Sequence, residues 1–269
     1  MPELPEVETT VRGIAPWLEG AVIGRVEVRD RRLRWPVPVA VEGAAGQAVR
    51  GVRRRAKYIL IELETGSLMI HLGMSGSLRV LTESARPRKH EHFDIKLPDC
   101  TIRYSDPRRF GSLLWLEPPA EDHPLLCSLG PEPLSEGFGG DWLHALSRGR
   151  KAAVKHFIMD GRVVVGVGNI YASEALYMAG VHPLRAAGRV SKARYEGLAV
   201  AIRDVLERAI RQGGTTLRDY SGSGGQPGYF AQELLVYGRA GEPCFQCGTA
   251  IRQKVIGQRS SYYCVRCQR

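Results

Sequence analysis

The sequence predicts an α+β, multidomain protein: an antiparallel β-region, then a helical region, then a small cysteine-rich end. Three observations support this prediction. Short segments rich in Val, Ile, Leu and Tyr fill the first half, apolar residues take helical spacing after residue 141, and four of the six cysteines lie in the last 26 residues. At 269 residues the chain is long for one core and suits two domains with an appendage.

The first domain, residues 1–130, is predicted to be an antiparallel sandwich or barrel. Turn signals such as Thr65-Gly66 and Pro98-Asp99 separate short strand-like segments, and this spacing is typical of both architectures. The expected strands are 22–30, 57–64, 68–72, 77–81, 93–97 and 101–104. Residues 131–141 have the composition of a loop and form the expected linker.

A helical domain is predicted over residues 142–228. Apolar residues recur at helical spacing in 191–212, where Ser191 is placed as the N-cap and Gly213-Gly214 as the terminator. Further helices are expected at 142–147, 151–160 and 169–179. The Gly- and Ser-rich run 221–228 is a predicted mobile loop.

The net charge narrows the class of partner. The chain has 38 Lys+Arg against 28 Asp+Glu, a formal charge of +10. Such a surplus indicates nucleic acid, an anionic membrane or solubility alone, and we favour nucleic acid. No apolar run approaches the roughly 18 residues of a membrane span. Because no export signal opens the chain and the cysteines form no disulfide framework, we expect a reduced, cytoplasmic setting.

Four cysteines form the strongest motif, in the predicted third domain (229–269). Cys244-x-x-Cys247 and Cys264-x-x-Cys267, sixteen residues apart, have the spacing of a structural zinc site. Four thiolates close the tetrahedral shell and leave no position for a catalytic water. The alternative is two disulfides. Between the pairs we expect a β-hairpin with Arg259 near its tip, although zinc ribbons bind proteins as well as DNA.

Two loops are rich in basic residues. Residues 50–57 carry five positive charges, and the simplest interpretation is a solvated loop. Lys57 differs because it meets an apolar strand, where burial would lower its pKa towards a proton-transfer role. In SDPRRFGS (105–112), Arg108 and Arg109 precede Phe110, which is the composition either of a surface turn or of a wedge that unstacks bases. Met74, flanked by Gly and Ser, is a second candidate wedge residue.

Two further motifs superficially resemble a metal site and a dinucleotide-binding turn. His90 and His92 in KHEH would share a strand face, but no neighbouring ligand spacing supports a metal, so phosphate binding or plain surface is favoured. GVGNIYASE (166–174) superficially resembles a dinucleotide turn, yet its third glycine position is Tyr171. A Gly-rich turn that ends in Asn169 at a helix start is still a good phosphate site, and Lys155 on the preceding helix would add charge.

The opening decapeptide MPELPEVETT is harder to explain as ordinary structure. A helix beginning near Pro5 accounts for Pro5, Glu6 and Glu8, because proline suits the first turn and carboxylates favour the positive end of the dipole. It does not account for Pro2 and Glu3, which therefore call for a chemical reason.

The motifs together carry a resemblance. With MPELPEVETT, RRRAKY, HLGMSG, DPRRFG, VVGVGNIYASE, GGTTLRD, PGYFAQELLVYGR and the CxxC pairs in this order, the whole chain strongly resembles the formamidopyrimidine-DNA glycosylases, bacterial 8-oxoguanine repair enzymes. The resemblance implies a β-sandwich preceded by a short helix, a helix–two-turn–helix domain and a zinc ribbon with one structural Zn²⁺. It also implies a base-excision repair enzyme that removes oxidised purines from double-stranded DNA and then cleaves the abasic site. We expect a monomer with no membrane partner.

The resemblance gives the opening residues a role. Met1 is expected to be trimmed, which leaves Pro2 as a free secondary amine; an α-amino group titrates near pH 8, so roughly a tenth is unprotonated at neutral pH. By resemblance, Pro2 attacks the sugar C1′ and forms a cationic iminium that drives elimination of the 3′ and then the 5′ phosphate. Glu3 is the implied general acid/base, Lys57 the implied proton donor during elimination, and Arg259 the implied phosphate grip.

The same resemblance implies the DNA contacts. Met74, Arg108 and Phe110 are implied to fill the duplex that the flipped lesion vacates, with Arg108 facing the orphaned cytosine. Lys155 and Asn169 are implied to pin the kinked backbone, and the loop 215–228 to close over the flipped base. The remaining implied DNA contacts are His90, Arg109 and the pair Arg150 and Lys151; the family usually has lysine near residue 150, so either member of the pair fills that position.

Two alternatives remain open. The sister enzyme endonuclease VIII has the same fold and nucleophile but acts on oxidised pyrimidines; its opening typically reads PEGPE, whereas this chain reads PELPEVE. A zinc-ribbon DNA-binding protein without catalysis is the second alternative. It would tolerate any N-terminus, so the placement of Pro2 and Glu3 counts against it.

Overall fold

A computed structural model describes residues 2–214 and 233–269. The chain divides into two compact units, Met1–Ser128 with Gln212–Ala231, and Leu129–Arg211 with Gln232–Arg269. The loops predicted at 215–228 and 221–228 lie outside the described residues. Within the described part, no helix is both long and apolar enough to cross a membrane.

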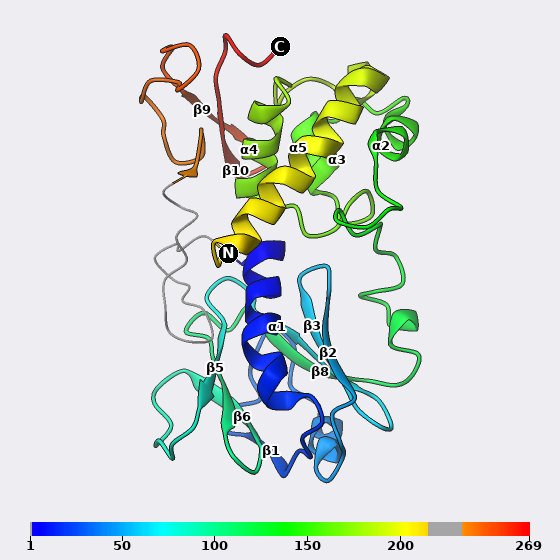
Figure 1. The fold of residues 1–269 in the computed structure, drawn as a ribbon, viewed down its shortest axis with the longest axis vertical. Helices are drawn as coiled ribbons and strands as arrows, with labels where there is room; N and C mark the ends of the chain where they lie inside the picture. The colour runs from blue at the N-terminus through cyan, green and yellow to red at the C-terminus, as the bar shows by residue number, and fades with distance from the viewer. Residues whose placement is uncertain (1, 215–232) are drawn as a thin grey trace. The chain divides into compact units, whose positions relative to one another are not determined.

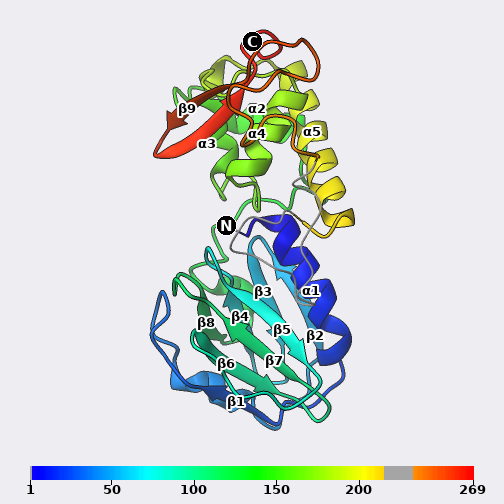
Figure 2. The ribbon, with the colours of Figure 1, turned by 90° about the vertical axis from the view of Figure 1, so that its left-hand side faces the viewer.

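The described part of the first unit is a β-sandwich with one α-helix, α1 (Leu4–Leu18), as the sequence predicted (Figure 2). All strand pairs are antiparallel. One sheet has the order β1 (Arg25–Val28), β6 (Glu91–Lys96), β7 (Thr101–Ser105), β5 (Ser77–Leu81). The other has the order β2 (Gly51–Arg55), β3 (Tyr58–Glu62), β4 (Ser67–His71), β8 (Ser112–Leu116). Short 3₁₀ turns lie at Val39–Ala44 and Ala120–Asp122.

One apolar core joins α1 to both sheets. Along α1, Val7, Val11, Ile14 and Leu18 recur every three or four residues and are all buried, so they form a single face of the helix. This face packs in the same cluster as residues of β3, β4, β6 and β7. The start of α1, with its predicted site residues, is therefore fixed to the sandwich.

The sequence analysis missed two of the strands. β8 was not predicted, and the interpretation of residues 50–57 as a solvated loop is wrong, because β2 occupies most of it. In β2 only Val52 is buried, while Arg53 pairs with Glu62 at 2.5 Å and Arg54 with Glu8 at 2.9 Å. Neutralised charges on a strand look like a loop in the sequence, because their acidic partners lie elsewhere in the chain.

The second unit contains the predicted helices and the zinc-ribbon hairpin (Figure 1). The helices are α2 (Gly140–Ser147), α3 (Val154–Met159), α4 (Asn169–Met178) and α5 (Lys192–Arg211), and a 3₁₀ turn lies at Ala187–Arg189. α5 packs on α2 and α4, and the hairpin of β9 (Arg252–Ile256) and β10 (Arg259–Tyr263) packs on α4 through β10. α3 is shorter than expected because Ala153 forms a β-bridge with Ala186.

Candidate functional site

Pro2 and Glu3 lie buried at the start of α1. Glu3 is the N-cap and forms a capping box with Glu6: the Glu3 backbone N–H donates to Glu6 Oε2 at 2.8 Å, and the Glu3 side chain accepts the backbone N–H of Glu6. Both carboxylates therefore lie at the positive end of the helix dipole. The capping box fixes the backbone next to Pro2, so the decapeptide has a structural role as well as its predicted chemical one.

Lys57 lies on the two-residue turn between β2 and β3. The turn needs a positive φ of 55° at Ala56, whose carbonyl accepts a hydrogen bond from the Arg54 guanidinium at 3.0 Å. Burial, together with the positive charges of Lys57 and Arg34, lowers the pKa of His71, at the end of β4, to about 4. At neutral pH His71 is thus uncharged, and its Nδ1 accepts the Gly73 N–H at 2.9 Å.

The candidate wedge residues come from two adjoining loops of the first unit. A Cβ built on Gly73 would lie 2.4 Å from the Gly111 nitrogen, so the turn that carries Met74 lies directly against the end of the loop that carries Phe110. Phe110 is 45% exposed, and the Arg108 guanidinium lies 5.1 Å from the centre of its ring. The structure thus brings these three candidate residues together, with an apolar ring and a cation open to solvent.

Two residues of this region have strained backbones: His90, next to the loops, and Arg109, within the loop that carries Phe110. Their φ angles are 71° and 58°, in the region that favours glycine. Arg109 pairs with Asp30 at 2.8 Å. His92 does not form a metal pair with His90, because its Nε2 bonds to the Asp106 carbonyl oxygen at 2.8 Å. Among the described residues the only potential metal cluster is the set of four cysteines.

In the second unit, Lys155 and Asn169 form one hydrogen-bonded group with the hairpin. The Lys155 side chain is buried, and its ammonium donates to Asn169 Oδ1 and to Ser261 Oγ, both at 2.7 Å. Asn169 begins α4, and its amide donates to the Ser260 carbonyl at 3.0 Å. Lys155 therefore orients Asn169 and ties it to β10, while Asn169 itself is only partly buried.

Arg259 is exposed directly after the tip of the zinc-ribbon hairpin, as the sequence predicted. The tip residues Gly257 and Gln258 both have positive φ, 51° and 63°, which is a type I′ turn. A Cβ on Gly257 would lie 2.2 Å from the His156 ring of α3, so a side chain here would displace that ring. Arg150 and Lys151 are exposed as well, on the segment before α3.

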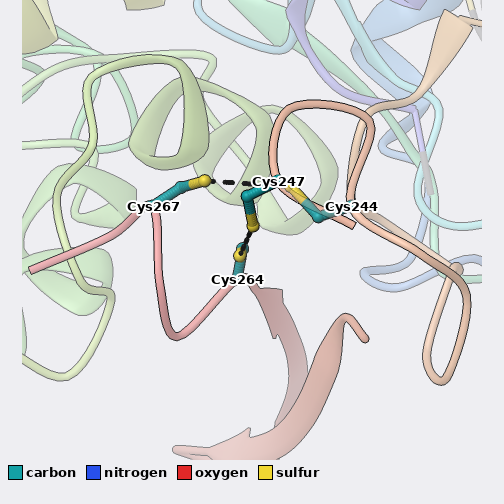
Figure 3. A group of neighbouring side chains, drawn as sticks. All are labelled: Cys244, Cys247, Cys264 and Cys267. Atoms are coloured by element: carbon teal, nitrogen blue, oxygen red, sulfur yellow. Dashed lines mark hydrogen bonds between the residues drawn. The ribbon is translucent and has the colours of Figure 1, made fainter. Parts of the chain in front are cut away.

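The four cysteines fit a zinc ion (Figure 3). Their sulfur atoms all lie within 4.8 Å of one another, with Sγ–Sγ distances of 3.9 Å for Cys244–Cys267 and 3.5 Å for Cys247–Cys264. Tetrahedral Zn–S bonds of about 2.3 Å place sulfurs about 3.8 Å apart. All six cysteines are free, so the disulfide alternative is wrong.

Residues that the sequence analysis did not single out support this zinc centre. Glu174, buried in α4, accepts the backbone N–H groups of residues 235, 236 and 237 at 2.7–3.0 Å. Burial raises the pKa of Glu174, while these three donors oppose the shift. Tyr177, one turn later, contacts Cys244 Sγ through its hydroxyl at 3.1 Å. GVGNIYASE contained Glu174, but nothing local indicated its distant partners.

Comparison with known proteins decides the family. Models of the formamidopyrimidine-DNA glycosylase N-terminal domain and H2TH domain match residues 1–113 and 129–221. A zinc-finger model, described as found in FPG and IleRS, matches residues 241–269. The chain belongs to the formamidopyrimidine-DNA glycosylase family. It is therefore a DNA glycosylase and AP lyase with a zinc finger that holds one structural Zn²⁺.

Relatives match over the full chain. The formamidopyrimidine-DNA glycosylases of Syntrophotalea carbinolica and a strain of Pseudomonas putida are each 60% identical over 271 residues, covering all of both chains. Among solved structures, a Lactococcus lactis FPG mutant in complex with a Fapy-dG containing DNA has a TM-score of 0.92 at 30% identity, covering all of both chains. The MutM (FPG) protein from Thermus thermophilus has a TM-score of 0.90 at 38% identity, covering 99% of this chain and 98% of that one.

Proposed function

We propose that the protein removes oxidised purines, 8-oxoguanine and formamidopyrimidines, from double-stranded DNA through Pro2, and then cleaves the strand by β,δ-elimination. The observation that carries this proposal is the placement of Pro2 and Glu3, adjacent and buried at the capped start of α1. The substrate class is supported by the PELPEVE opening and by the Lactococcus lactis relatives solved with Fapy-dG containing DNA.

Pro2 acts as the nucleophile after Met1 is removed. Its unprotonated amine attacks C1′ of the damaged nucleotide, the N-glycosidic bond breaks, and its electron pair leaves with the base. A secondary amine yields an iminium that carries a permanent positive charge. That charge accepts the electrons released when the C2′ proton is lost, so the 3′ phosphate leaves first and the 5′ phosphate second.

Glu3 and Lys57 move the protons. Glu3 protonates the sugar oxygen as the ring opens, and the α1 dipole favours return of its carboxylate to the charged form. Lys57 protonates a leaving group during elimination. The tight turn at Ala56 fixes the backbone next to Lys57, and the neighbouring His71 is uncharged at neutral pH.

The second unit holds phosphates. Asn169, at the start of α4, presents the helix N-terminus to a phosphate, while Lys155 holds the Asn169 side chain through their hydrogen bond. Arg259 grips a phosphate near the lesion and aids the last elimination. Zinc supplies no chemistry, because four thiolates complete its shell; it holds the hairpin that carries Arg259.

The wedge residues open the duplex. Extruding the lesion costs a few kcal/mol, and Met74 with Phe110 fills the vacated stack while Arg108 faces the orphaned cytosine. His90, Arg109, Arg150 and Lys151 add contacts to the DNA backbone.

Borohydride trapping tests the proposal. The protein, shown by mass to lack Met1, is incubated with a duplex containing 8-oxoguanine opposite cytosine, reduced, and the cross-linked peptide is mapped. We expect an adduct on Pro2, and none with the undamaged duplex as control. An adduct only with an oxidised pyrimidine would instead assign the endonuclease VIII substrate class. No adduct with any lesion would indicate a DNA-binding protein without this chemistry.

A further inference from the structure

A buried carboxylate lies where the three DNA-contact loops of the first unit meet. Asp106 follows β7 directly and its side chain is fully buried. The three loops are the Met74 turn, the segment 107–111 and the turn that carries His90. Neither the proposed chemistry nor the proposed wedge uses Asp106 itself.

Both oxygens of this carboxylate accept hydrogen bonds from the two wedge loops. Oδ1 accepts the Ser75 hydroxyl at 2.7 Å and the Arg108 N–H at 3.2 Å. Oδ2 accepts the Gly111 N–H at 2.8 Å and the Tyr104 hydroxyl at 3.2 Å. One side chain thus joins the Met74 turn to both ends of the loop that carries Arg108 and Phe110.

The backbone of Asp106 holds the third loop and the two strained residues. Its N–H donates to the His90 carbonyl at 2.9 Å, and its carbonyl accepts the Arg109 N–H at 3.3 Å. His90 and Arg109 are two of only four non-glycine residues with positive φ in the described chain. Such strain costs on the order of 1 kcal/mol or more per residue and persists only where the surroundings enforce it.

The hydrogen bonds of Asp106 come from neutral groups. Within the described residues no cationic side chain lies within ion-pair distance of it, whereas buried Asp94 pairs with Arg29, Lys96 and Arg103. A carboxylate that is buried with neutral donors forms strong, directional bonds to those donors. It therefore serves to fix loop geometry rather than to balance charge.

Close packing leaves these loops no room to shift separately. A Cβ on Gly76 would lie 2.3 Å from the Leu72 carbonyl oxygen, and one on Gly111 would lie 1.8 Å from the Tyr104 hydroxyl. Tyr104 itself is bonded to Asp106. Displacement of one loop would therefore displace its neighbours.

We propose that Asp106 is a positioning residue that couples the three loops, so that Met74, Arg108 and Phe110 enter the duplex as one rigid wedge. This inference rests on the wedge assigned under the proposed function. Its consequence is selective. Steps that need the duplex opened depend on Asp106, whereas chemistry at Pro2 on DNA that is already open does not.

Asp106→Asn tests the coupling without changing the side-chain volume. Whichever way the amide turns, its NH₂ faces the backbone N–H of either Arg108 or Gly111, and a backbone donor cannot rotate away. The Gly111 N–H then loses its acceptor, or the Arg108 N–H keeps only its 3.3 Å bond to Ser75 Oγ. We expect single-turnover excision of 8-oxoguanine from duplex DNA to fall roughly 10- to 100-fold, with cleavage of a single-stranded abasic oligonucleotide changed by less than about threefold.

A double-mutant cycle separates a wedge role from a merely structural one. Phe110→Ala removes the wedge directly, and if Asp106 acts through the wedge, the two substitutions together should cost little more than the larger alone. Additive effects would overturn the proposal, and so would equal losses on duplex and single-stranded substrates or an unchanged excision rate. Asp141→Asn, exposed in the second unit, is the matched control and should leave both rates unchanged.

A fold check and a DNA-free readout keep the result interpretable. If Asp106→Asn folds poorly, Ser75→Ala replaces it as the test variant. It removes one hydrogen-bond donor to Asp106 and should give a smaller loss of excision of the same kind. Backbone amide hydrogen exchange should rise together in 73–76, 88–92 and 107–111 of Asp106→Asn. Independent or unchanged exchange contradicts the coupling. Failure of the wild-type protein to trap single-stranded abasic DNA would instead contradict the proposed function, so the two failures are distinguishable.

Discussion

The two units hold their site residues by different means. In the first unit, loops extend from a sandwich whose apolar core joins α1 to both sheets. In the zinc ribbon the buried cluster is small, comprising Tyr177, Val236, Cys244, Ile251 and Cys264, and most of β9 is exposed. A hairpin with so little apolar area does not hold its shape alone. Metal and buried polar contacts replace the missing core.

Buried carboxylates show the same contrast. Asp106 joins loops that the sandwich already brings close together, and its partners lie 2–31 positions away in the chain. Glu174 joins α4 to residues 235–237, more than 60 positions away. Asp106 fixes loops on a scaffold that is already stable, whereas Glu174 contributes to the stability of its own scaffold. The following predictions test this contrast, from the largest expected effect to the smallest.

Removing zinc should unfold the zinc ribbon of the second unit and leave the first unit folded. Structural zinc contributes roughly 10–16 kcal/mol of binding free energy to small zinc folds. In chelated protein, amide hydrogen exchange should lose protection over 244–269 while β3 and β4 stay protected. Re-addition of zinc should restore protection. A ribbon that stays protected without metal would show that the apolar cluster suffices.

Glu174→Gln should destabilise the second unit by roughly 2–3 kcal/mol. The three backbone donors divide between the two carboxylate oxygens, so an amide in place of one oxygen leaves at least one buried N–H without an acceptor. Urea unfolding of the zinc-loaded protein measures the loss. Glu207→Gln, on the exposed surface of α5, is the control and should change the stability by less than about 0.5 kcal/mol. Equal losses in both variants would contradict the assignment.

His71 should make the first unit lose stability in mild acid. Its folded pKa of about 4 lies below the unfolded value of 6.5, so between these values the unfolded chain binds a proton that the folded chain does not. Stability is therefore full above pH 6.5 and falls as the pH is lowered towards 4. After allowance for solvent screening, we expect His71 to account for roughly 1–2 kcal/mol of the loss between pH 7 and pH 5.

Comparison with His71→Asn isolates that contribution, because the variant cannot titrate in this range. Urea unfolding at the two pH values gives the loss for each protein. The variant should lose less stability than the wild type on acidification. An identical pH dependence would show that His71 titrates normally in the folded protein.

Tyr177→Phe should weaken zinc binding by about tenfold. A zinc-bound thiolate carries no proton, so the Tyr177 hydroxyl donates to Cys244 Sγ, and such outer contacts typically change metal affinity roughly 10- to 100-fold. Zinc transfer to a competing chelator measures the change. Tyr195→Phe removes a hydroxyl that is bonded to the Ala187 carbonyl instead, and should keep the wild-type zinc affinity. Equal affinities in all three proteins would show that the Tyr177 hydroxyl does not stabilise the thiolate.

The helices and strands were predicted correctly where the sequence pattern that indicates them is local. Helical periodicity gave α5 to within one residue at each end, and the CxxC pairs gave the zinc ribbon with its hairpin. β2 was missed because Arg53 and Arg54 give it the composition of a solvated loop. In the folded chain Glu62 and Glu8 neutralise these two charges. Periodicity describes neighbours along the chain, and those partners are not neighbours.

The sequence by itself determined the family, the type of each domain and the zinc ligands, and it suggested the residues to which we assign the proposed chemistry. Each of these depends on residue types at short, fixed spacings. Only the tertiary structure decided what Asp106, Glu174 and His71 do. A buried polar side chain acts through its hydrogen-bond partners and its desolvation, and both are supplied by distant segments that meet only when the chain has folded.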